Sequence, residues 1–248
     1  MFQPSIVHHQ SCQGTACRIY LPDNFGMISW NVYKNNLKQP AFQPYLRSLM
    51  GVKKIDLMLF QEANFKSDKK CILSEFAIDA AANLEYRGKF YGVLTASMTE
   101  SQKSQAFLSE GKESLIGTHK SLLLSQFAFQ DGTTLLVLNV HAINFRENQR
   151  YGIEVDKFLQ HVKEHQGPMI IAGDFNSWNK KRMKKLAEMQ EVLSLQTISF
   201  REKSKIKSFM GYPLDYIFYR GLELIDSAVV DGKQLSDHNP LFAYFRKK

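Results

Sequence analysis

Acidic, amide and imidazole side chains stand at the ends of short apolar runs along this chain. Asn31 ends Ile-Ser-Trp-Asn, Glu62 ends Leu-Met-Leu-Phe-Gln-Glu, and His141 ends Leu-Val-Leu-Asn-Val-His. Asp174 and Asn176 follow the run Ile-Ile-Ala in the same way, after a single glycine. Because ligands of α/β proteins bind outside the carboxyl ends of strands, we expect these side chains to meet at one edge of a sheet.

A second histidine lies beside an acidic residue near the end of the chain. Asp237 and His238 come shortly before the apolar run Leu241 to Phe245. If that run forms a strand antiparallel to the others, its beginning lies at the same edge of the sheet. The pair then joins the side chains already gathered there.

Oxygen atoms dominate this set of candidate ligands, and no cysteine lies among them. The oxygen donors are Asn31, Glu62, Asp174, Asn176 and Asp237. Carboxylate and amide oxygens suit Mg²⁺ or Mn²⁺ and argue against structural zinc. The two histidines could transfer protons or, when charged, donate to a phosphate oxygen. These parts predict metal-assisted hydrolysis of a phosphate ester.

The elements that must position these groups are short strands. Apolar, β-rich runs occur at Met27 to Trp30, Ile55 to Phe60, Tyr91 to Leu94, Leu122 to Phe129, Leu135 to Val140, Met169 to Ala172, Leu214 to Tyr219 and Leu241 to Phe245. Asp131-Gly132, between two of them, predicts an antiparallel hairpin. Apolar residues at helical spacing from Tyr151 to Val162 predict a helix that ends before Gly167-Pro168. Hairpins mixed with strand-helix-strand units indicate an α/β sandwich.

Length and composition describe a globular chain. It has 248 residues, of which 44% are hydrophobic and 23% charged. No long linker or repeat interrupts it, so we expect one domain over residues 27–248 and an N-terminal extension of unknown role over residues 1–26. The longest apolar stretches are strand-sized, which predicts no membrane-spanning segment.

The cysteines and the beginning of the chain favour the cytoplasm. Cys12, Cys17 and Cys71 include no Cys-x-x-Cys pair, so free thiols are expected, with a Cys12–Cys17 disulfide as the alternative. The first 25 residues contain no apolar segment followed by a small-residue cleavage site, which predicts no secretory signal.

Positive charge gathers in one part of the chain. The net charge is +8, and Lys180 to Lys207 holds nine basic and three acidic residues. On a helix, Lys181, Lys184 and Lys185 share a face opposite Leu186 and Ala187, from which they could bind a phosphate backbone. A solvated basic face without a partner is the alternative reading.

Six short motifs, taken in order, resemble those of a known superfamily. They are Ser-Trp-Asn (29–31), Gln-Glu (61–62), Asn-Val-His (139–141), Gly-Asp-Phe-Asn (173–176), Leu-Asp-Tyr-Ile-Phe (214–218) and Ser-Asp-His (236–238). The set resembles the endonuclease/exonuclease/phosphatase superfamily, which includes DNase I, abasic-site endonucleases, sphingomyelinases and inositol-polyphosphate phosphatases. Longer matches around these motifs look like its YafD-like bacterial branch. The resemblance implies a four-layered α/β sandwich of the DNase I type, two mixed sheets packed face to face and flanked by helices.

The resemblance also implies ligands for the metal and the attacking water. Glu62 would be the principal metal ligand, helped by Asn31 and Asp237. Asp174 would orient or deprotonate the attacking water, and Asn176 would hold that water or a phosphate oxygen.

The histidines receive roles by the same resemblance. Asp215 would pair with His238, fix its tautomer and raise its pKa. His141 is a candidate acid for the leaving oxygen, although which histidine is acid and which is base stays open. Tyr33 stands where abasic-site enzymes often carry an aspartate, which weakens a second metal position.

Together these features predict a Mg²⁺-dependent phosphoesterase, with Mn²⁺ as a substitute ion, that acts as a nuclease on DNA ahead of RNA. A phosphatase or phosphodiesterase acting on phospholipid head groups or small phosphorylated metabolites is the alternative, and a catalytically silent binding protein is a third reading. The polar loop Thr99 to Thr118 is expected to set specificity. No protein partner is evident.

Overall fold

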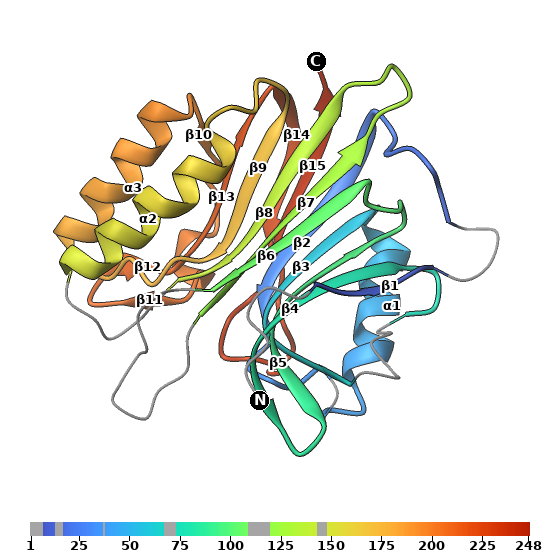
Figure 1. Ribbon diagram of the computed structural model, residues 1–248. Coiled ribbons are helices and arrows are strands. Elements are labelled where there is room, and N and C mark those ends of the chain that lie inside the picture. The colour runs from blue at the N-terminus through green and yellow to red at the C-terminus, as the bar shows by residue number, and fades with distance from the viewer. Residues whose placement is uncertain (1–6, 13–16, 37, 67–72, 109–119, 143–147) are drawn as a thin grey trace.

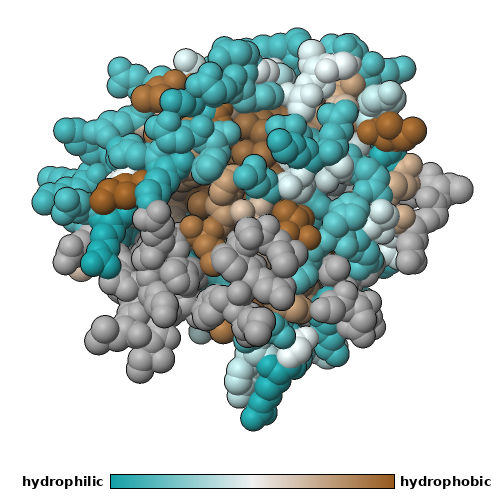
Figure 2. Space-filling view, viewed as in Figure 1, coloured by the Kyte–Doolittle hydropathy of each residue, from teal (hydrophilic) through white to brown (hydrophobic). Residues whose placement is uncertain are grey.

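Two mixed β-sheets packed face to face, with helices on their outer faces, make up the fold (Figure 1). The computed structural model describes residues 7–12, 17–36, 38–66, 73–108, 120–142 and 148–248. The four-layered α/β sandwich predicted from the sequence is confirmed. Figure 2 shows the same view in space-filling form, in which hydrophilic side chains cover most of the described surface.

The first sheet has seven strands. Their order is β1 (Val7–Gln10), β4 (Ala77–Tyr86), β5 (Lys89–Ser97), β3 (Leu57–Lys66), β2 (Asn24–Asn31), β15 (Leu241–Lys247) and β14 (Leu222–Val229). Strands β2 and β3 run parallel, whereas β15 is antiparallel to β2. The ends of β2 and β3 therefore lie at the same edge as the beginning of β15, as expected.

The second sheet has six strands. Their order is β10 (Gln196–Thr197), β13 (Asp215–Arg220), β9 (Met169–Asp174), β8 (Thr134–His141), β7 (Ser121–Ala128) and β6 (Lys103–Leu108). Strands β8 and β9 are parallel, and β7 and β8 are antiparallel. The hairpin predicted at Asp131-Gly132 joins β7 and β8, and Gly132 has a φ of +85°. A small ribbon, β11 (Ser208–Phe209) paired with β12 (Tyr212–Pro213), completes the strands.

Three apolar layers hold the sandwich together. Helix α1 (Phe42–Val52) packs on the first sheet around Trp30, Phe42 and Leu46. Helices α2 (Asn148–Val162) and α3 (Lys180–Val192) cover the second sheet, and a short 3-10 helix, η1 (Lys203–Lys205), lies further along the chain. Successive side chains of β2 point to opposite faces of the sheet. Met27 therefore packs between the two sheets, and Ile28 packs in the layer beneath α1.

Strand β4 escaped prediction because its sequence contains few β-forming residues. β4 reads Ala-Ile-Asp-Ala-Ala-Ala-Asn-Leu-Glu-Tyr, in which alanines replace the usual β-branched side chains. The small residues let β4 and β5 lie close together, because a Cβ atom on Gly92 of β5 would lie 1.9 Å from the Ala81 carbonyl oxygen of β4. The expected loop Thr99 to Thr118 contains strand β6, and its residues 109–118 lie outside the described part of the chain.

The N-terminal residues belong to the sandwich. Strand β1 pairs with β4, and Leu21 and Phe25 are buried between the sheets. The boundary expected at residue 27 therefore does not coincide with an edge of the fold. Cys12 and Cys17 form a disulfide, which corrects the expectation of two free thiols. No helix in the described residues is long and apolar enough to cross a membrane.

Candidate active site

A cavity of about 250 Å³ opens at the edge of the sandwich where strands β2, β3, β8 and β9 end. Its walls include Tyr33, Glu62, Lys120, His141, Asp174, Asn176, Trp178, Lys207, Ser208, Phe209, Leu214, Asp237 and His238. Six of the eight residues predicted for catalysis and metal binding are among them. The other two, Asn31 and Asp215, are bonded to wall residues, so the structure brings all eight together.

Strand register brings three of these residues into one row on the second sheet. His141 at the end of β8 lies opposite Asp174 at the end of β9, and Asp174 lies opposite Asp215 at the start of β13. All three are buried. The apolar stretches that precede His141 and Asp174 and follow Asp215 set the register, so the row is a direct consequence of where β8 and β9 end and β13 begins.

Three residues of the cavity wall, Tyr33, Glu62 and Asn176, have a positive φ, a backbone conformation that glycine and then asparagine adopt most readily. Glu62 has a φ of +50° and Asn176 a φ of +47°. Glu62 lies in a β-bulge of β3, where the pairing with β5 shifts between Phe60 and Ala63. Bulges redirect side chains beside active sites, and such a conformation persists where the surroundings enforce it. The bulge thus turns the Glu62 carboxylate toward the cavity.

Asn31 links the two sheets through hydrogen bonds. Its Nδ2 donates to Asp174 Oδ2 at 3.0 Å and to Glu62 Oε1 at 3.5 Å. Its Oδ1 accepts the Tyr33 backbone N–H at 3.1 Å, and a second lone pair on this oxygen stays available for a ligand. Asn31 therefore positions both carboxylates directly.

His238 is paired with Asp215, as predicted. The His238 Nδ1 atom lies 2.7 Å from Asp215 Oδ2, and both residues are buried. Burial opposes charge on the ring, but the carboxylates of Asp215, Asp174 and Asp237 outweigh it and raise the pKa of His238 to about 9. Trp30 Nε1 donates to the His238 carbonyl oxygen at 2.8 Å. The ring is thus held so that Nε2 faces the cavity.

Asp174 lies in the most buried part of the carboxylate group. Burial and the neighbouring Asp215 charge raise the pKa of Asp174 to about 7, against the lowering effect of His238. The backbone N–H of Asn176 donates to Asp174 Oδ1 at 3.0 Å. The other oxygen, Oδ2, lies 4.0 Å from His238 Nε2.

Lys120 is a wall residue that the sequence did not reveal. Its Nζ lies 3.0 Å from His141 Nε2, and both side chains are buried. Burial, together with the positive charges of Lys120, His238 and Lys34, holds the pKa of His141 well below its ordinary value. His141 is therefore neutral and accepts a hydrogen bond from the lysine, which places an ammonium group, rather than a charged histidine, at this wall.

Two more lysines neutralise the outer carboxylates. Lys34 Nζ lies 3.4 Å from Glu62 Oε2, and Lys207 Nζ lies 2.9 Å from Asp237 Oδ2. The Lys207 charge, with that of His238, lowers the pKa of Asp237 although burial opposes this. Neither lysine belongs to a motif, so only their closeness in space identifies them.

The donor set fits a divalent cation of the Mg²⁺ type. Ligand atoms of Asp174, Asp215 and His238 all lie within 4.8 Å of one another, and Asp215 Oδ1 is buried without a hydrogen-bond partner in the structure. Carboxylate oxygens from Glu62 and Asp237 face the same cavity. Hard oxygen donors of this kind are those that Mg²⁺ or Mn²⁺ prefers.

The basic helix α3 only partly matches the prediction. Lys181 and Lys184 are exposed, but Lys185 binds Asp156 of α2 at 2.6 Å and Glu188 at 3.3 Å. Ala187, expected on the buried side, is exposed. The reason is that α3 packs on α2 as well as on the sheet, so Lys185 lies at the helix–helix contact.

Arg182 of α3 is fully buried beneath the site. Its guanidinium lies between the rings of Tyr151 and Trp178, 4.5 Å and 4.7 Å from their centroids. It also donates to the Asn176 carbonyl oxygen at 2.8 Å. Arg182 thereby supports the left-handed Asn176 backbone and one wall of the cavity.

The pair Asp215–His238 leads to a pH prediction for the metal-free protein. Because the pKa of His238 is raised above 6.5, the pair stabilises the fold fully below pH 6.5, and this contribution is lost as the pH rises through about 9. In Asp215→Asn we expect the pKa of His238 to fall, measured by NMR of the imidazole. The stability difference between the two proteins should shrink above pH 9. An unchanged imidazole pKa in Asp215→Asn would contradict this assignment.

Comparison of the sequence with family models gives one clear match. The model of the Endonuclease/Exonuclease/phosphatase family matches residues 28–238. A UPF0294 protein of Photorhabdus laumondii is 35% identical over 226 residues, which span 88% of this chain and 82% of the relative. A UPF0294 protein of Vibrio campbellii is 32% identical over 222 residues, spanning 88% and 76% of the two chains.

Solved structures share the fold at low sequence identity. An endonuclease/exonuclease/phosphatase from Bacteroides vulgatus matches with a TM-score of 0.70 at 14% identity, over 91% of this chain and 99% of that chain. TDP2 of D. rerio, solved with a single-strand DNA product, has a TM-score of 0.62 at 14% identity, over 91% and 100%. These likenesses show a DNase I-like α/β sandwich.

Proposed function

The chain belongs to the endonuclease/exonuclease/phosphatase family, and from this premise we propose that it is a Mg²⁺-dependent nuclease that hydrolyses phosphodiester bonds, preferably in DNA. The observation that carries the proposal is the single cavity on which Glu62, Asp174 and His238 converge. Three carboxylates and three ammonium or imidazolium groups surround that cavity, so their charges nearly balance. A bound dication would make the site positive and suited to a phosphate.

Glu62, Asn31 and Asp237 are the residues we assign to the metal. When bound, Mg²⁺ neutralises charge on the phosphate and polarises it toward attack. The Lys34 and Lys207 ammonium groups, which lie against Glu62 and Asp237, mark these carboxylates as places where a cation is stabilised. Mn²⁺ is expected to substitute, because it prefers the same oxygen ligands.

The remaining polar residues act on the water and the phosphate. We assign Asp174 to orient the attacking water and accept its proton, with the Asn176 side chain beside it, anchored to the Ala142 carbonyl oxygen at 3.0 Å. His238, held by Asp215, presents Nε2 to a phosphate oxygen. His141, predicted as the acid, is neutral and accepts a hydrogen bond from Lys120, so we assign the Lys120 ammonium group as the donor to the leaving oxygen and His141 as the residue that positions it.

Two observations support nucleic acid as the substrate. One is the surface beside the cavity, and the other is the likeness to TDP2 of D. rerio, which was solved with a single-strand DNA product. Exposed basic residues lie on α3 and around η1. Lys207, at the end of this basic segment, is part of the cavity wall. Trp178 and Phe209, with ring centroids 6.0 Å apart, offer apolar rings beside the cavity, on which a base could stack. A cytoplasmic location accords with such a substrate.

A substrate screen tests the proposal. Plasmid DNA, an abasic oligonucleotide, single-stranded RNA, sphingomyelin and inositol phosphates are each incubated with the purified chain, with and without Mg²⁺. We expect metal-dependent cleavage of DNA. Turnover of a lipid or an inositol phosphate with no cleavage of nucleic acid would favour the head-group or small-metabolite alternative instead. Absence of all turnover would favour a silent binding protein.

The exposed lysines of α3 give a second test. In the double variant Lys181→Gln/Lys184→Gln we expect the KM for duplex DNA to rise several-fold while kcat stays unchanged, because the two charges contact phosphates outside the reacting group. Each lost contact should reduce the slope of log affinity against log salt by about 0.9.

The matched control for that variant is Lys163→Gln. Lys163 follows the carboxyl end of α2, at the edge of the sheet opposite the cavity, and its side chain is half-exposed. The same loss of DNA affinity in the control and the double variant would mean that only net charge matters, and would remove α3 from the binding surface.

A further inference from the structure

A second cluster of metal-ligating side chains lies far from the cavity, beside the N-terminal strand. His9 belongs to β1, Cys12 follows that strand, and Glu100 follows β5. Ser97, near Glu100, pairs with Leu57 at the beginning of β3, whereas Glu62 lies further along that strand. The cluster therefore occupies the edge of the sheet opposite the candidate active site.

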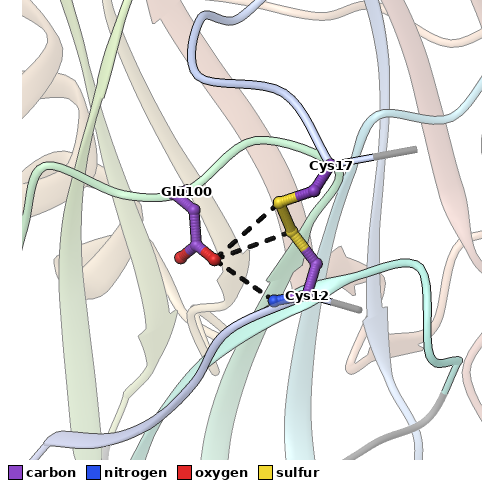
Figure 3. A group of neighbouring side chains, drawn as sticks. All are labelled: Cys12, Cys17 and Glu100. Carbon is purple, nitrogen blue, oxygen red and sulfur yellow. Dashed lines mark hydrogen bonds between the residues drawn. A yellow bond between two sulfur atoms is a disulfide. The ribbon is translucent and has the colours of Figure 1, made fainter. Parts of the chain in front are cut away.

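Glu100 faces the sulfur atoms of the disulfide (Figure 3). Its Oε1 lies 3.6 Å from Cys12 Sγ and 3.8 Å from Cys17 Sγ, and it accepts the Cys12 backbone N–H at 3.2 Å. A disulfide carries no S–H, so neither sulfur donates a hydrogen bond to the carboxylate. The Cys12 backbone N–H holds the carboxylate beside both sulfurs, so Glu100 is in place to bind a cation together with the two thiolates once the disulfide is reduced.

His9 contacts the second oxygen of the same carboxylate and can complete the ligand set when an ion binds. Its Nε2 lies 3.6 Å from Glu100 Oε2, and its Nδ1 lies 2.8 Å from Asp79 Oδ1. Asp79 is only 5% exposed and accepts a hydrogen bond from Ser101 Oγ at 2.6 Å. Metal-ligating histidines usually donate their second ring N–H to a carboxylate, which fixes the tautomer and the ring orientation. Asp79 holds His9 in this way, with Nε2 toward Glu100.

We propose that His9, Cys12, Cys17 and Glu100 form a Zn²⁺ site when the Cys12–Cys17 disulfide is reduced. Two thiolates, one imidazole nitrogen and one carboxylate oxygen make a tetrahedral zinc set, and four intervening residues lie within the usual spacing of paired cysteines. The non-bonded edges of such a tetrahedron are about 3.3–3.8 Å, from the zinc–ligand lengths. The distances from Glu100 Oε1 to the two sulfurs already fall in this range, whereas His9 contacts the other carboxylate oxygen, Oε2, and must move toward the sulfurs to bind the same ion.

Reduction of the Cys12–Cys17 disulfide and binding of Zn²⁺ balance in electrons and protons. A dithiol reductant passes two electrons and two protons to the Cys12–Cys17 bond and becomes a disulfide itself, which leaves two thiols on the chain. These thiols release two protons as Zn²⁺ binds their sulfurs. In a reducing compartment, such as the cytoplasm proposed for this chain, the zinc form would hold the N-terminal segment against Glu100, as the disulfide does in the structure.

Cobalt provides the direct test, because thiolate-to-cobalt charge transfer is visible only when sulfur binds the ion. The protein is reduced with dithiothreitol and freed of it by anaerobic gel filtration, and Co²⁺ and then Zn²⁺ are added. We expect a thiolate charge-transfer band with tetrahedral d–d bands, loss of both on addition of Zn²⁺, and one more equivalent of tight zinc than in Cys12→Ser/Cys17→Ser. The protein with its disulfide intact should show neither band.

Single variants separate the ligands from the residue that positions them. Glu100→Gln and His9→Ala keep both thiols and should each weaken zinc, by more than Asp79→Asn, for which we expect about 10–100-fold. Cys71→Ser is the matched thiol control and should bind as the wild type does. No thiolate band in the reduced wild type, or equal zinc content in the wild type and the double serine variant, would overturn the proposal.

Discussion

His238→Gln lowers kcat for metal-dependent phosphodiester hydrolysis by about 10²–10⁴-fold, the contribution of one positioned proton-transfer or charged donor group. Glutamine is the appropriate replacement because its amide can still donate to Asp215, which is buried and would otherwise lose its partner. The substitution removes the positive charge and the proton that Nε2 carries, and leaves the shape of the wall largely intact. We therefore expect the loss in kcat and only a small change in KM.

The control for this variant is another histidine of the same chain. His161 stacks on Phe107 at a centroid distance of 4.0 Å, near the carboxyl end of α2, and does not line the cavity. His161→Gln should retain the wild-type rate. Full activity in His238→Gln, with the free energy of unfolding unchanged, would remove His238 from the mechanism and leave Asp215–His238 as a structural pair.

The variant Asp215→Asn tests whether Asp215 acts through its negative charge or only by positioning the His238 ring. The amide keeps a side chain of the same size beside His238 but no longer stabilises the imidazolium. We expect the rate to fall less than in His238→Gln at low pH, where the ring is still protonated, and to approach that variant as the pH rises. A pH-independent loss would mean that Asp215 only orients the ring.

The residues that sequence alone could predict are those at strand ends. His141 and Asp174 lie opposite each other because β8 and β9 are parallel runs of apolar residues that both stop at the cavity. Hydrophobic patterning sets that register, and it is visible in a single sequence. The pairing of Asp215 with His238 needed the resemblance to a family, because the two lie 23 positions apart on different elements.

Other features of the site depend on contacts that no local pattern encodes. Lys120 directly precedes β7 in the sequence and belongs to no motif, so no adjacent residue predicts its contact with His141. The positive φ of Glu62 follows from a bulge set by the pairing of β3 with β5. Lys185 is not available to a phosphate, against the prediction, because α3 packs on α2 and pairs this lysine with Asp156. Such contacts between distant elements become visible only in the folded chain.

Glu62→Gln should produce the other large effect, and its signature differs from that of the His238 variant. Glutamine has the size of glutamate but no charge, so it weakens the attraction for a divalent cation while the bulge and the Asn31 contact can persist. We expect the Mg²⁺ concentration that gives half-maximal activity to rise by more than about 100-fold, since altering only an outer partner of a metal ligand already costs 10–100-fold.

Titration with Mg²⁺ separates the two roles. Activity of Glu62→Gln should recover in part at high Mg²⁺, whereas His238→Gln should stay slow at every concentration, because its defect lies in a donor and not in the metal. Glu191→Gln, an exposed position on α3, removes the same charge elsewhere and should titrate like the wild type. If Glu62→Gln has the wild-type Mg²⁺ dependence, then Glu62 does not hold the ion, and the buried oxygens of Asp174 and Asp215 become its ligands instead.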